Sequence, residues 1–145
     1  MFFFVPGERL TLDHDDHPPP DFTPHDAGPF PERAGPLWVD GAGERLGLRV
    51  RAHHLNRGGT AHGGLLATLV DTAMGHAVRG VAEAESAATV SLTTDFLGPA
   101  DEGDWVEART KVERVGGRLA FVDCSVRGEG REVVRARGVF ILLDG

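Results

Sequence analysis

The sequence predicts an α+β fold in which an antiparallel β-sheet wraps around one long central α-helix. Two observations lead to this prediction. Apolar residues recur at helical spacing near the middle of the chain, and four later segments have strand character. Such a helix buries itself most simply against a single curved sheet face. The length of 145 residues is enough for one domain with a single core.

Composition divides the chain near residue 37. Eight of the nine prolines lie within residues 1–36, mixed with acids and histidines, so packed secondary structure would be hard to sustain there. We therefore expect residues 1–36 to form an N-terminal arm and residues 37–145 to form the folded domain. Metal binding by His14, His17 and His25 is conceivable, but mixed runs of Asp and His are usually solvated, and no metal site is expected.

A strand and a loop come first in the expected domain. Leu46, Leu48 and Val50 alternate with glycine and arginine, which is the period of a half-buried strand. The strand is expected to cover residues 45–53. The glycine-rich residues 56–64 cannot hold a regular element and predict a tight loop.

A long helix and four strands follow the loop. The helix is apolar on most of its circumference and is expected to stop near Gly80. Its apolar positions are Leu65, Leu66, Leu69, Val70, Ala73, Met74 and Ala77. The strands, separated by glycine-containing turns, are expected at residues 87–97, 104–114, 119–127 and 132–143. Cys124 lies in an alternating stretch and is expected to be a small core residue.

Composition and charge exclude several classes of protein. The longest apolar run is far short of the roughly 18 residues that a membrane span needs. The apolar opening Met1–Val5 has no basic residue before it, unlike a signal peptide, so we expect a cytoplasmic protein. The net charge of −7 argues against a nucleic-acid partner, because phosphate backbones attract a basic surface.

Residues suited to hydrolytic chemistry gather around the start of the helix. Gly63 and Gly64 lie where the helix begins, and the unpaired N–H group of Gly63 could stabilise the negative oxygen that develops when a carbonyl is attacked. Asp71 is a carboxylate midway along an apolar helix, and a partly desolvated carboxylate can act as a general base that deprotonates water. General-base catalysis contributes typically ~10²–10⁴ in rate. Alternatively, Asp71 makes a helix-to-sheet hydrogen bond or lies on an exposed edge.

Two further residues of the loop have open roles. Asn56 can donate its side-chain amide to a substrate oxygen, or can equally cap a turn in the glycine-rich loop. His62 can polarise a substrate, or can fix the loop by capping the helix. The combination is more specific than either residue alone.

Helix geometry adds an inference about assembly. Gly63 and Asp71 are separated by eight residues on one helix, or about 12 Å along its axis. One carbonyl carbon cannot contact both groups. If both act in one site, the donor end must come from one chain and the carboxylate from a second chain across a two-fold axis. We therefore expect an obligate dimer.

At these residues the sequence resembles the hotdog-fold thioesterases of the PaaI-like type, with their pattern His-x-Asn-x-x-Gly-x-x-His-Gly-Gly-x6-Asp. The pattern is met by His54, Asn56, Gly59, His62, Gly63, Gly64 and Asp71. The similarity extends over residues 37–143 and includes the stretch 91–100, which resembles the family's strand after the helix. The amino-terminal arm falls outside it.

The resemblance implies a role for each site residue. Asp71 would act as base or nucleophile, while Asn56 and the Gly63 amide of a partner chain hold the thioester oxygen and His62 assists. Thr89 occupies a position where relatives often carry a hydroxyl that helps to place the water, although a β-branched strand residue is an equally good account. Dimers of this family commonly pair again into tetramers.

The expected reaction is hydrolysis of acyl-CoA or aryl-CoA thioesters to free acid and CoA, with no metal or cofactor. We expect Gly64, Leu66 and Val70 to contribute to an apolar substrate pocket. Among the basic residues of the later strands, most are expected to be solvated and one or two to contact CoA phosphates. These residues are Arg109, Lys111, Arg114, Arg118, Arg127, Arg131, Arg135 and Arg137.

Two other activities on the same fold are alternatives. A non-catalytic module that binds or senses acyl-CoA is the first, because fold alone does not set function. A dehydratase acting on β-hydroxyacyl thioesters is the second, but the sequence lacks the His-rich loop with a following acid that we associate with such enzymes.

Overall fold

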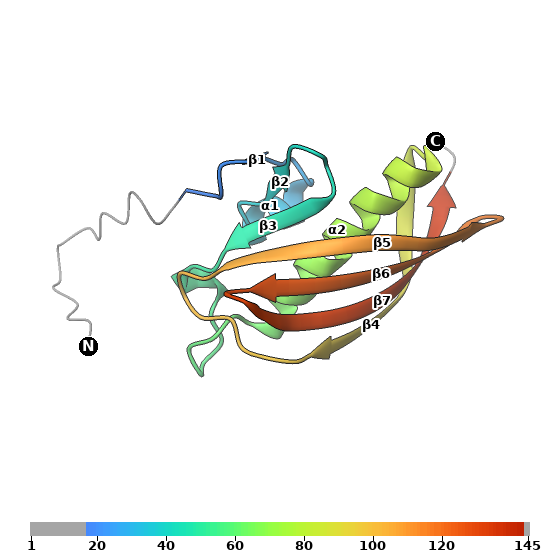
Figure 1. Cartoon of the computed structure of the whole chain (residues 1–145). Helices are drawn as coiled ribbons and strands as arrows, with labels where there is room; N and C mark the ends of the chain where they lie inside the picture. Colours follow the sequence, from blue (N-terminus) through green and yellow to red (C-terminus); the bar gives the residue numbers. More distant parts are fainter. Residues whose placement is uncertain (1–16, 144–145) are drawn as a thin grey trace, which may run out of the picture.

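A computed structural model describes residues 17–143 of the chain (Figure 1). As expected, one long helix and then four strands follow the loop. The described elements are β1 (Phe22–Pro24), α1 (Pro29–Ala34), β2 (Trp38–Asp40), β3 (Arg45–Arg49), the 3₁₀ turn η1 (Ala52–His54), α2 (Gly63–Ala82), β4 (Ser86–Phe96), β5 (Trp105–Gly116), β6 (Leu119–Gly128) and β7 (Arg131–Leu143).

The described strands form one antiparallel sheet in the order β1-β2-β3-β5-β6-β7-β4. Helix α2 runs behind β5, β6 and β7 in Figure 1 and packs against their inner faces. The predicted architecture, an antiparallel sheet around one long helix, is confirmed. Strand β4 connects directly to α2, and among the strands of residues 17–143 it pairs only with β7, which leaves its other edge open in this part of the chain.

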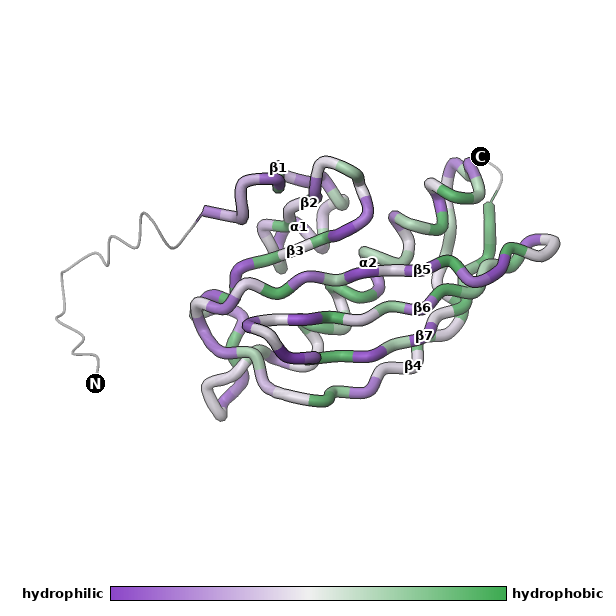
Figure 2. The backbone as a smooth tube through the Cα atoms, in the orientation of Figure 1, coloured by the Kyte–Doolittle hydropathy of each residue, from purple (hydrophilic) through white to green (hydrophobic). Residues whose placement is uncertain are grey.

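Alternating hydropathy explains why the sheet and the helix pack in this way. Figure 2 shows hydrophobic and hydrophilic residues alternating along β5, β6 and β7, so each strand turns one apolar face to α2. The helix contributes Leu69, Val70 and Met74 to the core. Gly138 of β7 lies so close to α2 that an added Cβ would be 2.6 Å from the Met74 sulfur, and the Met74 side chain would have to shift to accept it.

The boundaries of two elements differ from the prediction. Strand β3 ends at Arg49 instead of continuing to residue 53, because the chain turns into η1. Helix α2 continues past Gly80 to Ala82, and Glu83 takes the left-handed conformation that ends it (φ 51°). Gly80 is exposed and meets no neighbour, so it neither stops the helix nor serves close packing.

The expectation that packed secondary structure is hard to sustain before residue 37 is wrong for the described part of that segment. Pro29 begins α1, where a missing N–H costs no hydrogen bond, and Pro24 lies in β1, an outer strand of three residues. Phe22 is 6% exposed and packs edge-to-face against Trp105, with ring centroids 5.1 Å apart. Residues 1–16, including His14 and Met1–Val5, lie outside the described residues.

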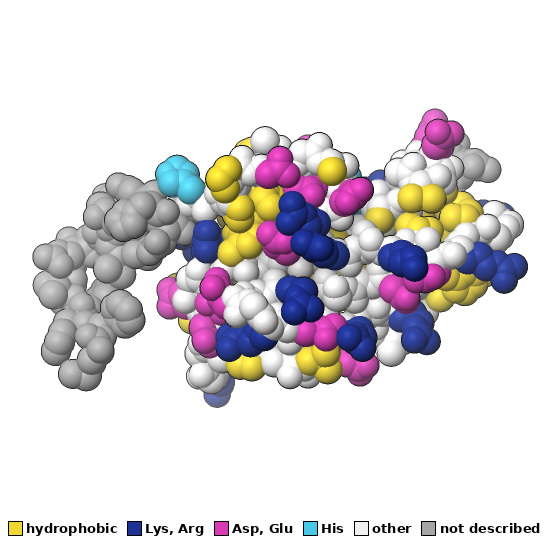
Figure 3. Space-filling view, in the orientation of Figure 1, with side chains coloured by type: hydrophobic (Ala, Val, Ile, Leu, Met, Phe, Trp, Pro, Cys, Tyr) yellow, Lys and Arg dark blue, Asp and Glu magenta, His cyan; other side chains and the backbone are white. Residues whose placement is uncertain are grey.

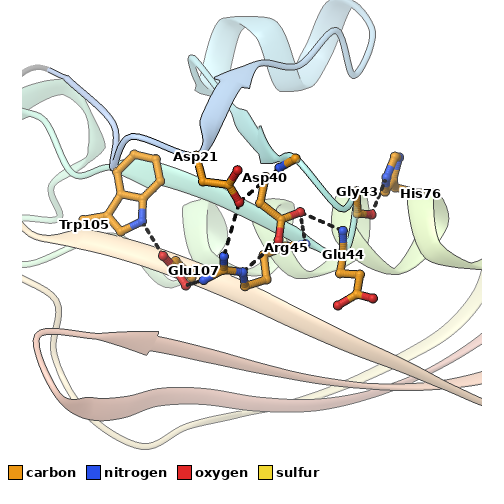
Figure 4. A network of polar contacts seen from close by, with 9 residues as sticks. Asp21, Asp40, Gly43, Glu44, Arg45, His76, Trp105 and Glu107 are labelled. Carbon is orange, nitrogen blue, oxygen red and sulfur yellow. Dashed lines mark hydrogen bonds and ion pairs between the residues drawn. The ribbon is translucent and has the colours of Figure 1, made fainter.

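A polar network also ties the N-terminal strands to the sheet (Figure 4). The Arg45 guanidinium donates to the buried Asp40 carboxylate at 2.9 Å and to Glu107 of β5 at 3.1 Å. Burial alone would raise the pKa of Asp40, but the hydrogen bonds from Arg45 and Glu44 outweigh it, and the pKa lies below 3.8. The Trp105 indole N–H donates to Glu107 at 3.0 Å. The network links β2, β3 and β5.

Three further expectations concern single features. Cys124 is buried, as predicted for a core residue, and burial raises the pKa of its thiol to about 12. Among residues 17–143, no helix is long and apolar enough to span a membrane. In the same part of the chain, no group of three or more His, Cys, Asp or Glu side chains is arranged to hold a metal ion.

Candidate active site

The loop before α2 is a narrow hairpin closed at its base. The His62 N–H donates to the His54 carbonyl at 2.8 Å, and Leu55 and Ala61 form an antiparallel bridge next to it. At the tip, the Asn56 N–H donates to the Thr60 carbonyl at 2.8 Å. We call residues 55–62 the donor loop. Its backbone bonds fix Asn56 and His62 relative to the start of the helix.

Asn56 has the structural role that the sequence left open. Its side-chain oxygen accepts the Thr60 N–H at 3.2 Å, and its side-chain amide donates to the Thr60 hydroxyl at 3.2 Å. The residue is exposed. Because an amide nitrogen carries two hydrogens, one donor of Asn56 remains available to a ligand.

His62 is the N-cap of α2. Its Nδ1 accepts the Gly64 N–H at 2.8 Å, which satisfies one of the donors at the helix start. An accepting Nδ1 carries no proton, so the hydrogen of the neutral ring is on Nε2. The ring is exposed. The capping role is therefore present, and it leaves an N–H donor on the outer side of the ring.

The Gly63 N–H donates no hydrogen bond within the described part of the chain, whereas the next three N–H groups of the helix are bonded to His62. An added Cβ on Gly63 would make ordinary contacts with the Phe96 ring, the nearest at 3.4 Å. Packing therefore does not require glycine here. With glycine at this position, the methyl-sized space beside the Phe96 ring stays empty.

Asp71 is half-buried and accepts a hydrogen bond from the Thr89 hydroxyl of β4 at 2.5 Å. The helix-to-sheet hydrogen bond that the sequence left as an alternative is thus present. It occupies Oδ1 and leaves Oδ2 without a hydrogen bond from the residues described. Thr89 is exposed and lies next to a register shift between Thr89 and Ser91, and its hydroxyl reaches Asp71 of α2.

The structure therefore gathers the candidate residues into two groups at separate places on one chain. Asn56, His62 and Gly63 surround the start of α2, and Asp71 with Thr89 lies about two turns further along. No hydrogen bond joins the two groups among residues 17–143. A single described chain does not bring all five residues to one carbonyl.

The remaining candidates have roles in packing and capping. Leu66 and Val70 are 3% and 0% exposed and belong to the core of the chain, and Gly64 gives its N–H to the His62 cap. Sequence reasoning missed Phe96, whose 53% exposed ring contacts Gly63. It also gave His54 no role beyond the motif. A lone aromatic at a strand end carries no local signal for contact with a helix start in a different segment.

Comparison with known families identifies the class to which this arrangement belongs. A family profile described as Thioesterase superfamily matches residues 58–135, which is more than half of the chain. The chain belongs to this superfamily. A Pseudomonas aeruginosa protein that carries the name of an esterase, PA0474, is 39% identical over 80% of this chain and 90% of its own length. Mouse acyl-coenzyme A thioesterase 13 is 30% identical over 68% of this chain and 74% of its own length.

Solved structures agree with this assignment. The Escherichia coli PaaI protein of the phenylacetic acid degradation operon is similar with a TM-score of 0.66 and 28% identity, covering 70% of this chain and 72% of that one. The Bacillus halodurans protein BH2602, solved with CoA, is similar with a TM-score of 0.65 and 26% identity, covering 70% of this chain and 68% of that one. The chain is a hotdog-fold thioester hydrolase with PaaI among its structural neighbours, and the predicted resemblance to this family is confirmed.

Proposed function

We propose that the protein hydrolyses acyl-CoA or aryl-CoA thioesters to the free acid and CoA, with Asp71 as the general base. The observation that carries the proposal is the pair of unused groups on α2. Neither makes a hydrogen bond to another described residue: one is the Gly63 N–H at the helix start, and the other is Oδ2 of Asp71, whose Oδ1 accepts the Thr89 hydroxyl.

The reaction follows from the chemistry of these groups. Asp71 takes a proton from water while the water oxygen attacks the thioester carbon. The carbonyl oxygen becomes negative and accepts hydrogen bonds from the Gly63 N–H and the Asn56 amide, with the His62 Nε2–H nearby. When the intermediate collapses, the C–S bond breaks, and the proton on Asp71 passes to the leaving sulfur. The products are the free acid and the CoA thiol.

This mechanism requires two chains, because the donors and the base are about 12 Å apart along α2. The open edge of β4 is the surface best suited to pairing. It is 11 residues long, it carries exposed Val90 and Phe96, and its outer backbone groups have no strand beside them in the described chain. An antiparallel β4–β4 contact would bring the donor end of one chain towards the Asp71 of the other.

A second pairing of dimers would use the outer face of the sheet. Figure 3 shows Lys and Arg side chains alternating with Asp and Glu on this face, and a hollow of about 810 Å³ lies between them. Neighbouring opposite charges such as Arg137 and Asp123 allow two such faces to match each other across a two-fold axis. CoA phosphates would find cations at the same surface, where Arg109 and Arg127 have no ion-pair partner among the described residues.

The test is a thiol-release assay over short-chain, long-chain and aromatic CoA esters with the wild type and Asp71→Asn. We expect the substitution to lower kcat by at least ~10² while the melting temperature changes little, because it keeps the size and the Thr89 contact but removes the base. Glu85→Gln, an exposed carboxylate that lies before β4 and outside the hollow, is the matched control and should keep full activity.

Near-normal turnover by Asp71→Asn on a good substrate would contradict the assignment of the base. Thermal stabilisation of the wild type by acyl-CoA without thiol release from any ester would instead indicate a binding module. Dimer formation is measured by sedimentation, and a monomeric, fully active protein would refute the two-chain site.

A further inference from the structure

The N-terminal segment is hydrogen-bonded to the donor loop through His54. This residue is 3% exposed. Its Nε2–H donates to the Ala34 carbonyl at 2.6 Å, and its Nδ1 accepts the Arg51 N–H at 2.9 Å. Its own carbonyl accepts the His62 N–H at 2.8 Å, which closes the base of the donor loop. One buried residue thus connects the end of α1 with the start of α2.

Helix-end chemistry explains why histidine fits this place. Ala34 is the last residue of α1 and Gly35 is its C-cap, and carbonyls at a helix C-terminus have no partner within the helix. His54 donates to the first of these carbonyls, and His53 donates to the second at 3.3 Å. The two rings lie 3.9 Å apart. The end of α1 is therefore capped by side chains that belong to η1.

We propose that His54 is a positioning residue of the hydrolytic site, which holds the donor loop in place through its bond to α1. The inference rests on the proposed function, in which Asn56, His62 and Gly63 donate to the substrate oxygen. It assigns to residues 29–35, which lie outside the part of the chain that resembles the family, a role in catalysis without contact to substrate. Loss of the hydrogen bond to the Ala34 carbonyl leaves the buried Nε2–H of His54 unpaired, and the base of the donor loop is then free to shift.

The contacts require a neutral ring, because Nδ1 accepts a hydrogen bond while Nε2 donates one. The pKa of His54 is lowered below 6.5, first by burial and further by the nearby His53 and Arg51, while the carbonyls of Ala34 and Gly35 act in the opposite direction. The His54 ring is therefore neutral at neutral pH and can hold the donor loop through both hydrogen bonds. Protonation would break the bond from Arg51 and weaken the attachment.

Two substitutions test the two ring nitrogens of His54 separately. His54→Gln places an amide N–H where Nε2 lies and can keep the Ala34 bond, whereas His54→Asn places an acceptor where Nδ1 lies and loses that bond. We expect His54→Asn to lower kcat about 10- to 100-fold with little change in KM, because misplaced donors act in the transition state. His54→Gln should recover most of the activity. His76→Asn is the matched control: it also removes a histidine bond to a carbonyl, that of Gly43 at 3.1 Å, but does not touch the donor loop, and kcat should be unchanged.

Hydrogen exchange followed by mass spectrometry supplies a readout that is independent of turnover. In His54→Asn, the amides of the donor loop and of residues 29–35 should lose protection together, while β5–β7 keep theirs. Equal kcat for wild type and His54→Asn, equal losses in the Asn and Gln variants, or unchanged exchange of the donor loop would each overturn the proposal. If the wild type hydrolyses no thioester, the proposed function fails, and the exchange result alone decides whether His54 holds the loop.

Discussion

Gly63→Ala tests the free helix-end donor most directly, because the fold can accept the added methyl group. The new Cβ would lie 3.4 Å from Phe96, which is ordinary contact, and Gly63 is not among the glycines with positive φ. Alanine is favoured over glycine within a helix by up to about 1 kcal/mol. We therefore expect the melting temperature to stay unchanged or to rise by no more than about 2–4 °C.

Activity should respond in the opposite direction. The methyl group would lie against the Phe96 ring, and we expect it to obstruct a carbonyl that approaches the Gly63 N–H. Loss of one oxyanion donor in hydrolases costs ~10²–10³ in kcat, or about 2.7–4 kcal/mol of transition-state stabilisation. The assay is thiol release with a good CoA ester, measured beside thermal unfolding of the same preparation.

A second substitution strengthens this test. Phe96→Ala removes the ring that faces the new methyl group, so Gly63→Ala should cost less activity in the Phe96→Ala background than in the wild type. Activity of Gly63→Ala within about threefold of wild type, with an intact fold, would refute the steric reasoning, because ~10²–10³ is expected. A large fall in melting temperature would show instead that the contact with Phe96 is tighter than ordinary packing.

Other predictions concern the base, the buried ion pair and pH. Thr89→Val keeps the strand shape but removes the hydroxyl bonded to Asp71, and kcat should fall about tenfold while sedimentation shows the same assembly; an unchanged kcat would reduce Thr89 to a strand former. Arg45→Met should lower the free energy of unfolding by roughly 2–4 kcal/mol in urea titration, because Asp40 stays buried without its cation; a change below about 0.5 kcal/mol would contradict this. The lowered pKa of His54 means that the unfolded chain binds a proton that the folded chain does not, so stability is full above pH 6.5 and falls as the pH drops below it; a melting temperature that stays constant from pH 7 to 5 would contradict this sign.

Local periodicity was sufficient to predict the domain's framework. The repeat of apolar residues every three or four positions located α2, and alternation located β5, β6 and β7 to within a few residues. The separation of Gly63 from Asp71 also follows from the sequence, because the rise of a helix is constant. These features depend on backbone geometry and on which face of an element is apolar.

The N-terminal segment shows where sequence reasoning failed. Its prolines and charges suggest a solvated arm, yet Phe22 is buried against Trp105 and the end of α1 is bonded to His54. Proline is tolerated at the start of a short helix and in an outer strand, so composition alone could not exclude packing there. The partners that stabilise the segment lie many residues away and leave no local pattern.

The sequence by itself determined the long helix, the strands that follow it and the residue types of the candidate site. Only the tertiary structure decided which of their atoms are already bonded: Asp71 to Thr89, Asn56 to Thr60, and His62 to Gly64. It also decided which groups make no hydrogen bond within residues 17–143, above all the Gly63 N–H. The physical reason is that the spacing of residues within an element follows from a fixed backbone repeat, whereas contacts between elements depend on how their faces pack in three dimensions.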